Sequence, residues 1–588
     1  MNSKKIKTEW NLNVLYKNGS DPQIERDVVQ YEKMCEDFEK KYKNRTDYLE
    51  SEEKLSDALK EYEKFLEIIG HSKPYNYFYF RKDINGQDQE AEAKLNQLTQ
   101  RLTKASNKTL FFRLALGKIE KNKQKEILKN KKLAHYHYFL EVIFKSAQHT
   151  LTEPEEKILN LKALPSHSLW VRGQQKLLNQ QTIIFKGKVM AVSEAYERIT
   201  TLPTKDRRAL SDMLYKKLRE VSDFSESEIN AIYTDKKISD ELRGFKEPYS
   251  ATILSYENDE KSIMNLVETV TQHFSISQRF YKLKAKLHNL NYLEYADRAA
   301  PVGKLKVTFS FEDSLQMLRK AFAKAGSGYV EILNRYIEKG QIDVYPKKGK
   351  KGGAYCSGQV NLPTFVLLNH VGSFRSLTTF AHEMGHAFHT ELSKSQPLLY
   401  QDYTTSVAEV ASTFFENFAF DEVFSKLSKK EQIVALHDKI NDSIGTIFRQ
   451  IACFNYELEM HKTIREKGSI SKEDMAALHN KHMKAYLGPI MRLKENDGYM
   501  FVNWPHLRYS FYVYSYAYGE IISKALYAKY KEDPHYMKEI KSFLSAGGSK
   551  SPEQIFKDIG IDTSKPEFFV KGLKSIEEDI KELEKLVS

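Results

Sequence analysis

Cysteine, glycine and proline are all scarce in this chain, and each scarcity excludes a class of structure. The three cysteines in 588 residues, Cys35, Cys356 and Cys453, are too few and too scattered for a disulfide framework. With only 26 glycines and 15 prolines, the chain lacks the turn residues that an all-β fold requires. No apolar run approaches the roughly 18 residues of a membrane-spanning helix. The sequence therefore predicts a helix-rich protein with reduced thiols and no membrane span.

The sequence also shows no pattern of a secretory signal and no large region in which charges of one sign are concentrated. Residues 1–10 include basic side chains but no apolar core of about 7–15 residues, so we expect no secretory signal and a cytoplasmic location. Lysine and arginine exceed the acids by 91 to 79, which gives a net charge of +12. However, the lysines alternate with glutamates, as in residues 118–132, which is typical of solvated helix faces. No nucleic-acid partner is predicted.

Hydrophobic residues, at 41% of the chain, are sufficient for a large core. Between residues 21 and 190 the apolar side chains recur at helical spacing, and helical patterns continue over 200–290 and from 374 onward. We expect an N-terminal helical lobe over 1–190 and a larger domain over 200–588 that carries the functional site. The predicted fold class is mainly α.

A small sheet is expected immediately before the helix that starts near residue 374. Residues 306–311 alternate between apolar and polar side chains in the manner of a strand. Further short extended segments are predicted over 342–345, 354–357 and 364–369. The sheet should therefore lie beside that helix.

The most specific motif is His382-Glu383-x-x-His386, which lies in an apolar stretch. Residues four apart in an α-helix lie on the same face, so both imidazoles can reach one ion. Such a pair binds Zn²⁺ at about 2.0–2.1 Å, and Glu383 is placed to accept a proton from water. The motif predicts one zinc ion with Glu383 as general base. The alternative is a core helix whose histidines satisfy one another.

Catalytic zinc needs a third protein ligand, and the chain offers two acids at suitable spacing. Glu409 and Glu416 lie seven residues apart on a second predicted apolar helix, far enough after His386 for a loop and a return. Spacing alone does not separate them, and the acid that does not bind the metal should orient a histidine. His389 is nearer, but about 10.5 Å of helix axis separates it from His382, too far for one tetrahedral ion.

A tyrosine-rich segment follows further along the chain. Pro505 suits the first turn of a helix, and Tyr509, Tyr512 and Tyr516 would then share one face. Their hydroxyls and His506 could donate hydrogen bonds to the oxyanion of a tetrahedral intermediate. The alternative is an aromatic packing stripe, because other aromatic residues of the segment form a second row.

With these motifs, the chain resembles the M3 metallopeptidase family, and specifically its oligoendopeptidase F subgroup. The similarity covers at least residues 200–570, and residues 9–16 are also similar to the N-terminus of that subgroup. The segments that carry the resemblance are 243–245, 352–356, 366–374, 382–389, 409–416, 448–450 and 505–519.

The resemblance implies that Glu409 is the third zinc ligand and that His506 and at least one tyrosine contact the substrate. It also implies a largely helical, two-lobed, cytoplasmic enzyme whose zinc lies in a deep channel that admits short peptides. We therefore predict a zinc-dependent oligoendopeptidase in which metal-activated water hydrolyses internal bonds of short, unstructured peptides. Residues 352–354 are expected to form an edge strand that pairs with the substrate backbone.

Two other functions stay open on the sequence. A metallocarboxypeptidase on a similar helical scaffold would need a basic residue to bind the terminal carboxylate of its substrate. A peptide-binding protein without catalysis would not need Glu383. Mn²⁺ or Co²⁺ could also support activity, because first-row metals share such ligands. The sequence does not predict the cleavage preference or the oligomeric state.

Overall fold

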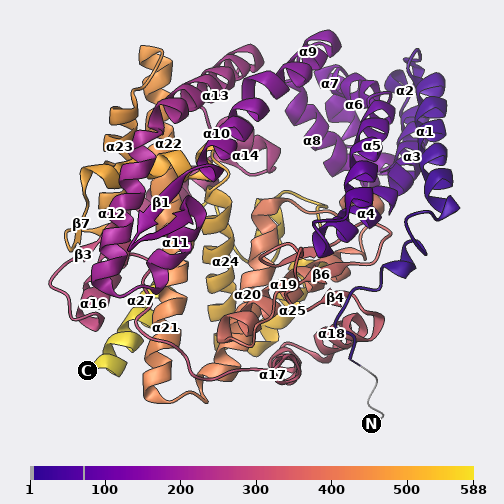
Figure 1. Ribbon diagram of the computed structural model, residues 1–588. Helices are drawn as coiled ribbons and strands as arrows, with labels where there is room; N and C mark the ends of the chain where they lie inside the picture. Colours follow the sequence, from indigo (N-terminus) through magenta and orange to yellow (C-terminus); the bar gives the residue numbers. More distant parts are fainter. Residues whose placement is uncertain (1–5, 70–72) are drawn as a thin grey trace. The chain divides into compact units, whose positions relative to one another are not determined.

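The computed structural model describes residues 6–69 and 73–588 (Figure 1). The predicted absence of a secretory signal rests partly on residues 1–5, which lie outside the described residues. Two compact units form, and each is assembled from separate stretches of chain: Met1–Glu153, Val307–Ser425 and Tyr530–Ile559 in unit 1, and Pro154–Lys306, Lys426–Lys529 and Gly560–Ser588 in unit 2. The expected division into residues 1–190 and 200–588 assigns one continuous stretch of chain to each part, and it stays a prediction.

Unit 1 consists mainly of helices. Those formed by its N-terminal stretch are α1 (Pro22–Tyr42), α2 (Asp47–Glu50), α3 (Glu52–Ile69), α4 (Lys73–Ile84), α5 (Gln89–Ser106), α6 (Leu110–Gly117), α7 (Lys121–Ile127) and α8 (His137–Ala147). Those formed by its later stretches are α17 (Phe311–Ala323), α18 (Ser327–Lys339), α19 (Phe374–Ser393), α20 (Thr405–Phe424), α25 (Met537–Ser545) and α26 (Pro552–Asp558). Aromatic and aliphatic side chains of α1, α3, α6 and α8 form one of its cores.

A small sheet lies beside helix α19 in unit 1. Strand β6 (Phe365–Leu367) is central, with β4 (Ile342–Asp343) parallel on one side and β5 (Tyr355–Ser357) antiparallel on the other. Trp10 fixes the N-terminal segment to this sheet, because its indole N–H donates to the Val366 carbonyl at 2.8 Å and its ring packs against Phe80 and Phe365. The prediction of a small sheet beside the HExxH helix is thus confirmed.

Unit 2 is also mainly helical. Its helices are α9 (Glu153–Ala163), α10 (Leu169–Asn179), α11 (Val192–Thr201), α12 (Thr204–Glu220), α13 (Ser222–Arg243), α14 (Ser250–Ser255), α15 (Glu260–Gln272), α16 (Phe274–Leu287), α21 (Lys429–Thr446), α22 (Phe448–Lys467), α23 (Lys472–Leu487), α24 (Tyr514–Glu532) and α27 (Pro566–Val587). Its strands are β1 (Thr182–Phe185), β2 (Lys188–Ala191), β3 (Leu293–Glu294) and β7 (Met491–Arg492). The predicted mainly α fold is confirmed.

Two local predictions fail, each for an identifiable reason. Residues 306–311 do not form a strand, because Ser310 and Asp313 form a capping box that begins helix α17 at Phe311. The hairpin β1–β2 lies at the end of the stretch over 21–190 for which the sequence predicts helices, and strand β2 ends one residue beyond it. Its turn residues Lys186 and Gly187 have φ values of 50° and 77°, the left-handed geometry of a two-residue hairpin turn.

Within the part of the chain that the structure describes, no helix combines the length and the apolar character that a bilayer crossing requires.

Candidate metal centre

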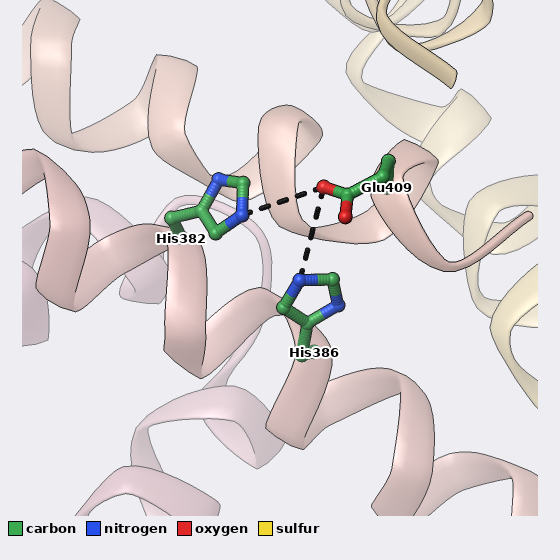
Figure 2. A group of neighbouring side chains, drawn as sticks. All are labelled: His382, His386 and Glu409. Atoms are coloured by element: carbon green, nitrogen blue, oxygen red, sulfur yellow. Dashed lines mark ion pairs between the residues drawn. The ribbon is translucent and has the colours of Figure 1, made fainter. Parts of the chain in front are cut away.

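Helix α19 presents the two histidines of the motif on one face. Ser373 caps the helix, because its hydroxyl accepts the Ser376 backbone N–H at 3.1 Å. The apolar residues of the motif region are buried, namely Phe380, Ala381, Met384, Ala387 and Phe388. His382 and His386 therefore project together from the remaining face, with ring centroids 5.0 Å apart (Figure 2).

Helix α20 brings the third candidate ligand to these histidines. The two helices approach closely at Gly385, where a Cβ atom would lie 2.6 Å from Ser412 Cα and 2.7 Å from the Ala411 carbonyl oxygen. Only glycine allows this separation, because both neighbours are backbone atoms that cannot rotate away. The close packing places Glu409 of α20 opposite both imidazoles (Figure 2). Sequence reasoning missed this role, although a glycine inside an apolar helix was the signal.

One oxygen of Glu409 is shared between the two rings. Glu409 Oε2 lies 3.5 Å from His382 Nε2 and 3.9 Å from His386 Nε2. Ligand atoms of these three residues all lie within 4.8 Å of one another. In a tetrahedral zinc site with bonds of about 2.0–2.1 Å, ligand atoms are roughly 3.3 Å apart. Two imidazoles and one carboxylate, gathered this closely, fit a divalent transition metal with one position left for water or substrate.

Glu416 lies on the other side of the His382 ring. Its Oε2 is 3.3 Å from His382 Nδ1, so the two acids of helix α20 contact different nitrogens of one imidazole. Burial favours neutral His382, but hydrogen bonds to Glu409 and Glu416 outweigh it and raise the pKa of His382 well above its usual value. Burial likewise opposes ionisation of Glu409, yet His382 and His386 lower the pKa of Glu409 to about 2. Glu409 is therefore a carboxylate.

Glu383 is a buried acid with a free oxygen. Only 6% of the residue is exposed, and its Oε2 accepts no hydrogen bond from the described residues. Burial, followed by the charges of Glu409 and Glu416, raises the pKa of Glu383 to about 7, although His382 and the backbone N–H of Cys356 act in the opposite direction. A carboxyl group tuned this way can both accept and return a proton near neutral pH.

A cavity of about 620 Å³ in unit 1 opens onto these side chains. Its wall includes strand β5 and the residues that follow it, together with the start of helix α20. The lining residues are Ala354, Tyr355, Cys356, Gly358, Gln359, Val360, His382, Glu383, His386, Thr390, Lys394, Gln401, Asp402, Tyr403, Ala408 and Glu409. The predicted edge strand over 352–354 is wrong in position, since the strand begins at Tyr355 after two glycines. Strand β5 is nevertheless an edge of its sheet.

His389 and Glu391, two other polar residues of helix α19, have different contacts. His389 is buried and stacks on Tyr403 with ring centroids 3.6 Å apart. Glu391 binds Arg335 at 2.5 Å and Lys394 at 2.7 Å. Neither belongs to the group of metal-ligating atoms.

The tyrosine-rich segment lies in unit 2, and it is not the continuous helix that we predicted. Residues Pro505–Arg508 form a 3₁₀ turn, Ser510 and Phe511 have φ values of 39° and 63°, and helix α24 begins only at Tyr514. The Glu457 carboxylate holds this irregular turn by accepting the Phe511 backbone N–H at 3.0 Å. The spacing of the tyrosines predicted a helix face, but two residues with positive φ lie between Tyr509 and Tyr512, outside any helix.

Tertiary contacts still gather part of the predicted set. The Tyr512 hydroxyl lies 2.8 Å from His506 Nδ1, and Tyr516 stacks against the same imidazole at 6.0 Å. Gln450, which sequence reasoning missed, lies 3.3 Å from His506 Nε2, so both ring nitrogens have a polar neighbour. Burial, followed by the charge of Arg449, lowers the pKa of His506 to about 4. Tyr509 is 55% exposed.

Two protein-family models and several known proteins match this chain. The model of the family described as Peptidase family M3 matches residues 204–575, and that described as Oligopeptidase F matches residues 116–179. The chain is 27% identical to oligopeptidase PepF of Bacillus subtilis (strain 168) over 563 residues, which cover 93% of this chain and 83% of that protein. It is 26% identical to an oligoendopeptidase F homolog of Borreliella burgdorferi, and the match covers 95% of this chain and 94% of that protein.

Solved structures share the fold. A peptidase from Chlamydophila abortus superposes with a TM-score of 0.85 at 22% identity, covering 99% of this chain and 100% of that one. Oligoendopeptidase F from Enterococcus faecium superposes with a TM-score of 0.72 at 18% identity. The superposition covers 96% of this chain and 99% of that chain. At these identities the likeness concerns the fold alone.

Proposed function

Because the chain belongs to peptidase family M3 and is a metallo-oligopeptidase, we propose that it is a zinc-dependent endopeptidase that hydrolyses internal bonds of short, unstructured peptides. The observation that carries the proposal is the convergence of His382, His386 and Glu409 beside the free oxygen of Glu383 in one cavity. The names of the relatives, oligopeptidase and oligoendopeptidase, support the substrate class.

His382, His386 and Glu409 would hold the metal, and Glu416 would fix the His382 ring through Nδ1. A zinc ion supplies a Lewis acid that lowers the pKa of water toward about 7. The donor set also accepts Mn²⁺ or Co²⁺, so zinc is the proposed resident ion and the others are proposed substitutes.

Glu383 performs the proton transfers in this proposal. Its free Oε2 accepts a proton as the water oxygen bonds to the scissile carbonyl carbon. The same carboxyl group then gives that proton to the amine nitrogen as the C–N bond breaks. The elevated pKa of Glu383, about 7, suits both steps because neither protonation state is strongly favoured near neutral pH.

Two further groups are proposed to contact the peptide. The outer edge of strand β5 borders the cavity, and an extended peptide can pair with such an edge through its main chain. His506, Tyr509, Tyr512 and Tyr516 are proposed as a polar set that binds the substrate and its oxyanion. The contact between His506 and the Tyr512 hydroxyl supports Tyr512 as the donor among these tyrosines.

The decisive assay uses a ten-residue peptide blocked at both ends. An endopeptidase cuts it internally, whereas a carboxypeptidase leaves it intact and a non-catalytic peptide-binding protein binds it unchanged. A carboxypeptidase of Pyrococcus furiosus has a related fold, with a TM-score of 0.50 at 15% identity, so fold likeness alone does not separate the first two. Mass spectrometry should find internal products, and chelation should abolish them until zinc is restored.

Glu383→Gln is the matched control for that assay. The amide keeps the shape of the side chain but cannot accept the proton, so we expect zinc to stay bound while turnover falls by about 10²–10⁴-fold. If the variant retains activity within about tenfold of the wild type, Glu383 is not the general base.

Substrate size and location are also part of the proposal. A short peptide should be cleaved much faster than the same sequence carried in a folded domain, because only the free peptide can extend along strand β5. Equal rates would indicate a general protease. We propose the cytoplasm as the site of action, which the three free cysteines support.

A further inference from the structure

The turn at Ser510 and Phe511 holds the backbone in a conformation that these residues rarely adopt. Their φ values are 39° and 63°, a region that is strongly disfavoured for a side chain as large as phenylalanine. Such residues persist only where surrounding contacts fix them, and they cluster at functional sites. Tyr512 follows the turn directly, and its hydroxyl lies 2.8 Å from His506 Nδ1. The turn therefore sets the point from which the Tyr512 side chain starts.

Two side chains of unit 2 bind both polar groups of a single peptide unit in this turn. Glu457 Oε1 accepts the Phe511 N–H at 3.0 Å, and the Thr252 hydroxyl donates to the Ser510 carbonyl at 2.8 Å. The Phe511 ring is fully buried and packs against Phe454, with ring centroids 5.1 Å apart. A rotation of this peptide unit would break both hydrogen bonds, so its orientation is fixed.

Helix α22 contacts the tyrosine-rich segment at two places. Gln450 lies seven residues before Glu457, so the two side chains share one face of the helix about 10.5 Å apart along its axis. Gln450 Nε2 lies 3.3 Å from His506 Nε2, while Glu457 binds the turn at Phe511. One rigid helix therefore sets the positions of the imidazole and of the turn that precedes Tyr512.

An acid is a costly choice for the position of Glu457. The residue is 0% exposed, and no lysine or arginine of the described residues lies within 4 Å of its carboxyl group. His461 Nε2 is 3.8 Å from Glu457 Oε1, but burial lowers the pKa of His461 well below its usual value, so this imidazole is neutral. Burial also raises the pKa of Glu457 to about 8, against the opposing effects of the Phe511 N–H and Lys236. An apolar side chain would avoid this cost, but it could not accept the Phe511 N–H.

We propose that Glu457 is a positioning residue for peptide hydrolysis. By binding the Phe511 N–H it fixes the peptide unit that precedes Tyr512, and it thereby holds the Tyr512 hydroxyl against His506. Because Glu457 is 0% exposed, it cannot contact a bound peptide, and its effect on turnover passes through Tyr512. The inference rests on the proposed function, because it takes the Tyr512 hydroxyl as the donor to the oxyanion.

The test is a double-mutant cycle on the full, zinc-loaded chain, with kcat and KM measured on the ten-residue peptide blocked at both ends. Glu457→Met removes the acceptor oxygen, and we expect kcat to fall about 100-fold while KM changes little. In the Tyr512→Phe variant the same substitution should lower kcat by less than about threefold, because the hydroxyl that it would misplace is already absent. Glu457→Gln keeps an acceptor oxygen and should retain kcat within about threefold of the wild type.

Asn230→Leu is the matched control for the loss of a hydrogen bond that holds a backbone in unit 2. The Asn230 side chain accepts the Ile470 N–H at 2.9 Å, and its other hydrogen bonds are to the carbonyls of Glu226 and Ile470. We expect kcat to be unchanged in this variant. Both Asn230→Leu and Glu457→Met should bind zinc as the wild type does, because the metal ligands lie in unit 1.

Equal kcat losses from Glu457→Met in the wild type and in Tyr512→Phe would overturn the inference, as would a Glu457→Met variant with wild-type kcat. A loss in Glu457→Gln or Asn230→Leu as large as that in Glu457→Met would also overturn it. If Glu457→Met fails to fold, Glu457→Asp withdraws the oxygen by one methylene group and enters the same cycle with the same expected pattern.

The wild type separates this inference from the proposed function. If it does not cut the blocked peptide internally, both are overturned. If it does, and the losses from the two substitutions are independent, only the role of Glu457 is overturned.

Discussion

Glu416 lies 3.3 Å from Nδ1 of His382, while Nε2 of the same ring lies 3.5 Å from Glu409. The two acids, seven residues apart on helix α20, therefore approach the imidazole from opposite edges. Glu416 is in position to select the tautomer and orientation of the ring, and Glu409 is in position to share a metal with it. Their separate roles lead to the first prediction.

Glu409→Gln should weaken zinc binding more than Glu416→Gln does. Loss of the charged ligand atom should lower the affinity by more than about 100-fold, whereas loss of the orienting acid should cost about 10–100-fold. Competition with a zinc-chelating dye measures both constants. The reverse order would make Glu416 the ligand.

Gly385→Ala should disrupt the contact between helices α19 and α20. The new methyl group would lie 2.6 Å from Ser412 Cα, so the helices must separate and move Glu409 away from the histidines. We expect a loss of about 1–3 kcal/mol in unfolding free energy, accompanied by weaker zinc binding. Gly328→Ala is the control in helix α18 of the same unit, where a Cβ atom meets nothing within 4 Å. Equal effects of the two substitutions would refute the packing argument.

Tyr512→Phe should lower kcat by about 10²–10³-fold with little change in KM, if its hydroxyl stabilises the oxyanion. Tyr345→Phe is the control, because Tyr345 is 44% exposed and lies outside the residues proposed to bind the substrate. Steady-state kinetics on one end-blocked peptide compares the variants. A kcat of Tyr512→Phe within tenfold of the wild type would remove Tyr512 from the proposed role.

Asp297→Asn should destabilise the protein by about 3–5 kcal/mol near neutral pH, since it leaves Arg207 and Arg208 without their buried partner. Although burial raises the pKa of Asp297, hydrogen bonds from the Glu294 backbone N–H and the two arginines lower it below its usual value. An acid whose pKa is lowered by folding stabilises the protein above the unfolded pKa, and this contribution is lost as the pH falls.

The difference in unfolding midpoint between wild type and Asp297→Asn should therefore stay constant from about pH 8 to pH 5. It should narrow below about pH 4, the pKa of an unfolded aspartate. Asp212→Asn is the control, because Asp212 forms an exposed pair with Lys494 and should contribute at most about 1 kcal/mol. A difference for Asp297→Asn that grows on acidification would contradict the prediction.

The sequence by itself determined what is local. The spacing of His382 and His386 requires only a helix, and helical periodicity is set by neighbouring residues, so the shared face of the two imidazoles follows directly. The mainly α fold follows for the same reason. Two local signals overlap near residue 310. The apolar and polar alternation of residues 306–311 predicted a strand, but the capping box of Ser310 and Asp313 begins a helix there instead.

Only the tertiary structure decided which distant groups meet. Glu409 and Glu416 are equivalent by spacing, and the close approach of two backbones at Gly385 assigns each to a different nitrogen of His382. Likewise, the sequence placed Tyr512 on a helix face, whereas the strained turn at Ser510 and Phe511 brings it to His506. The physical reason is the same in both cases. Contacts between elements depend on how side chains pack across the whole core, and no periodicity within one segment carries that information.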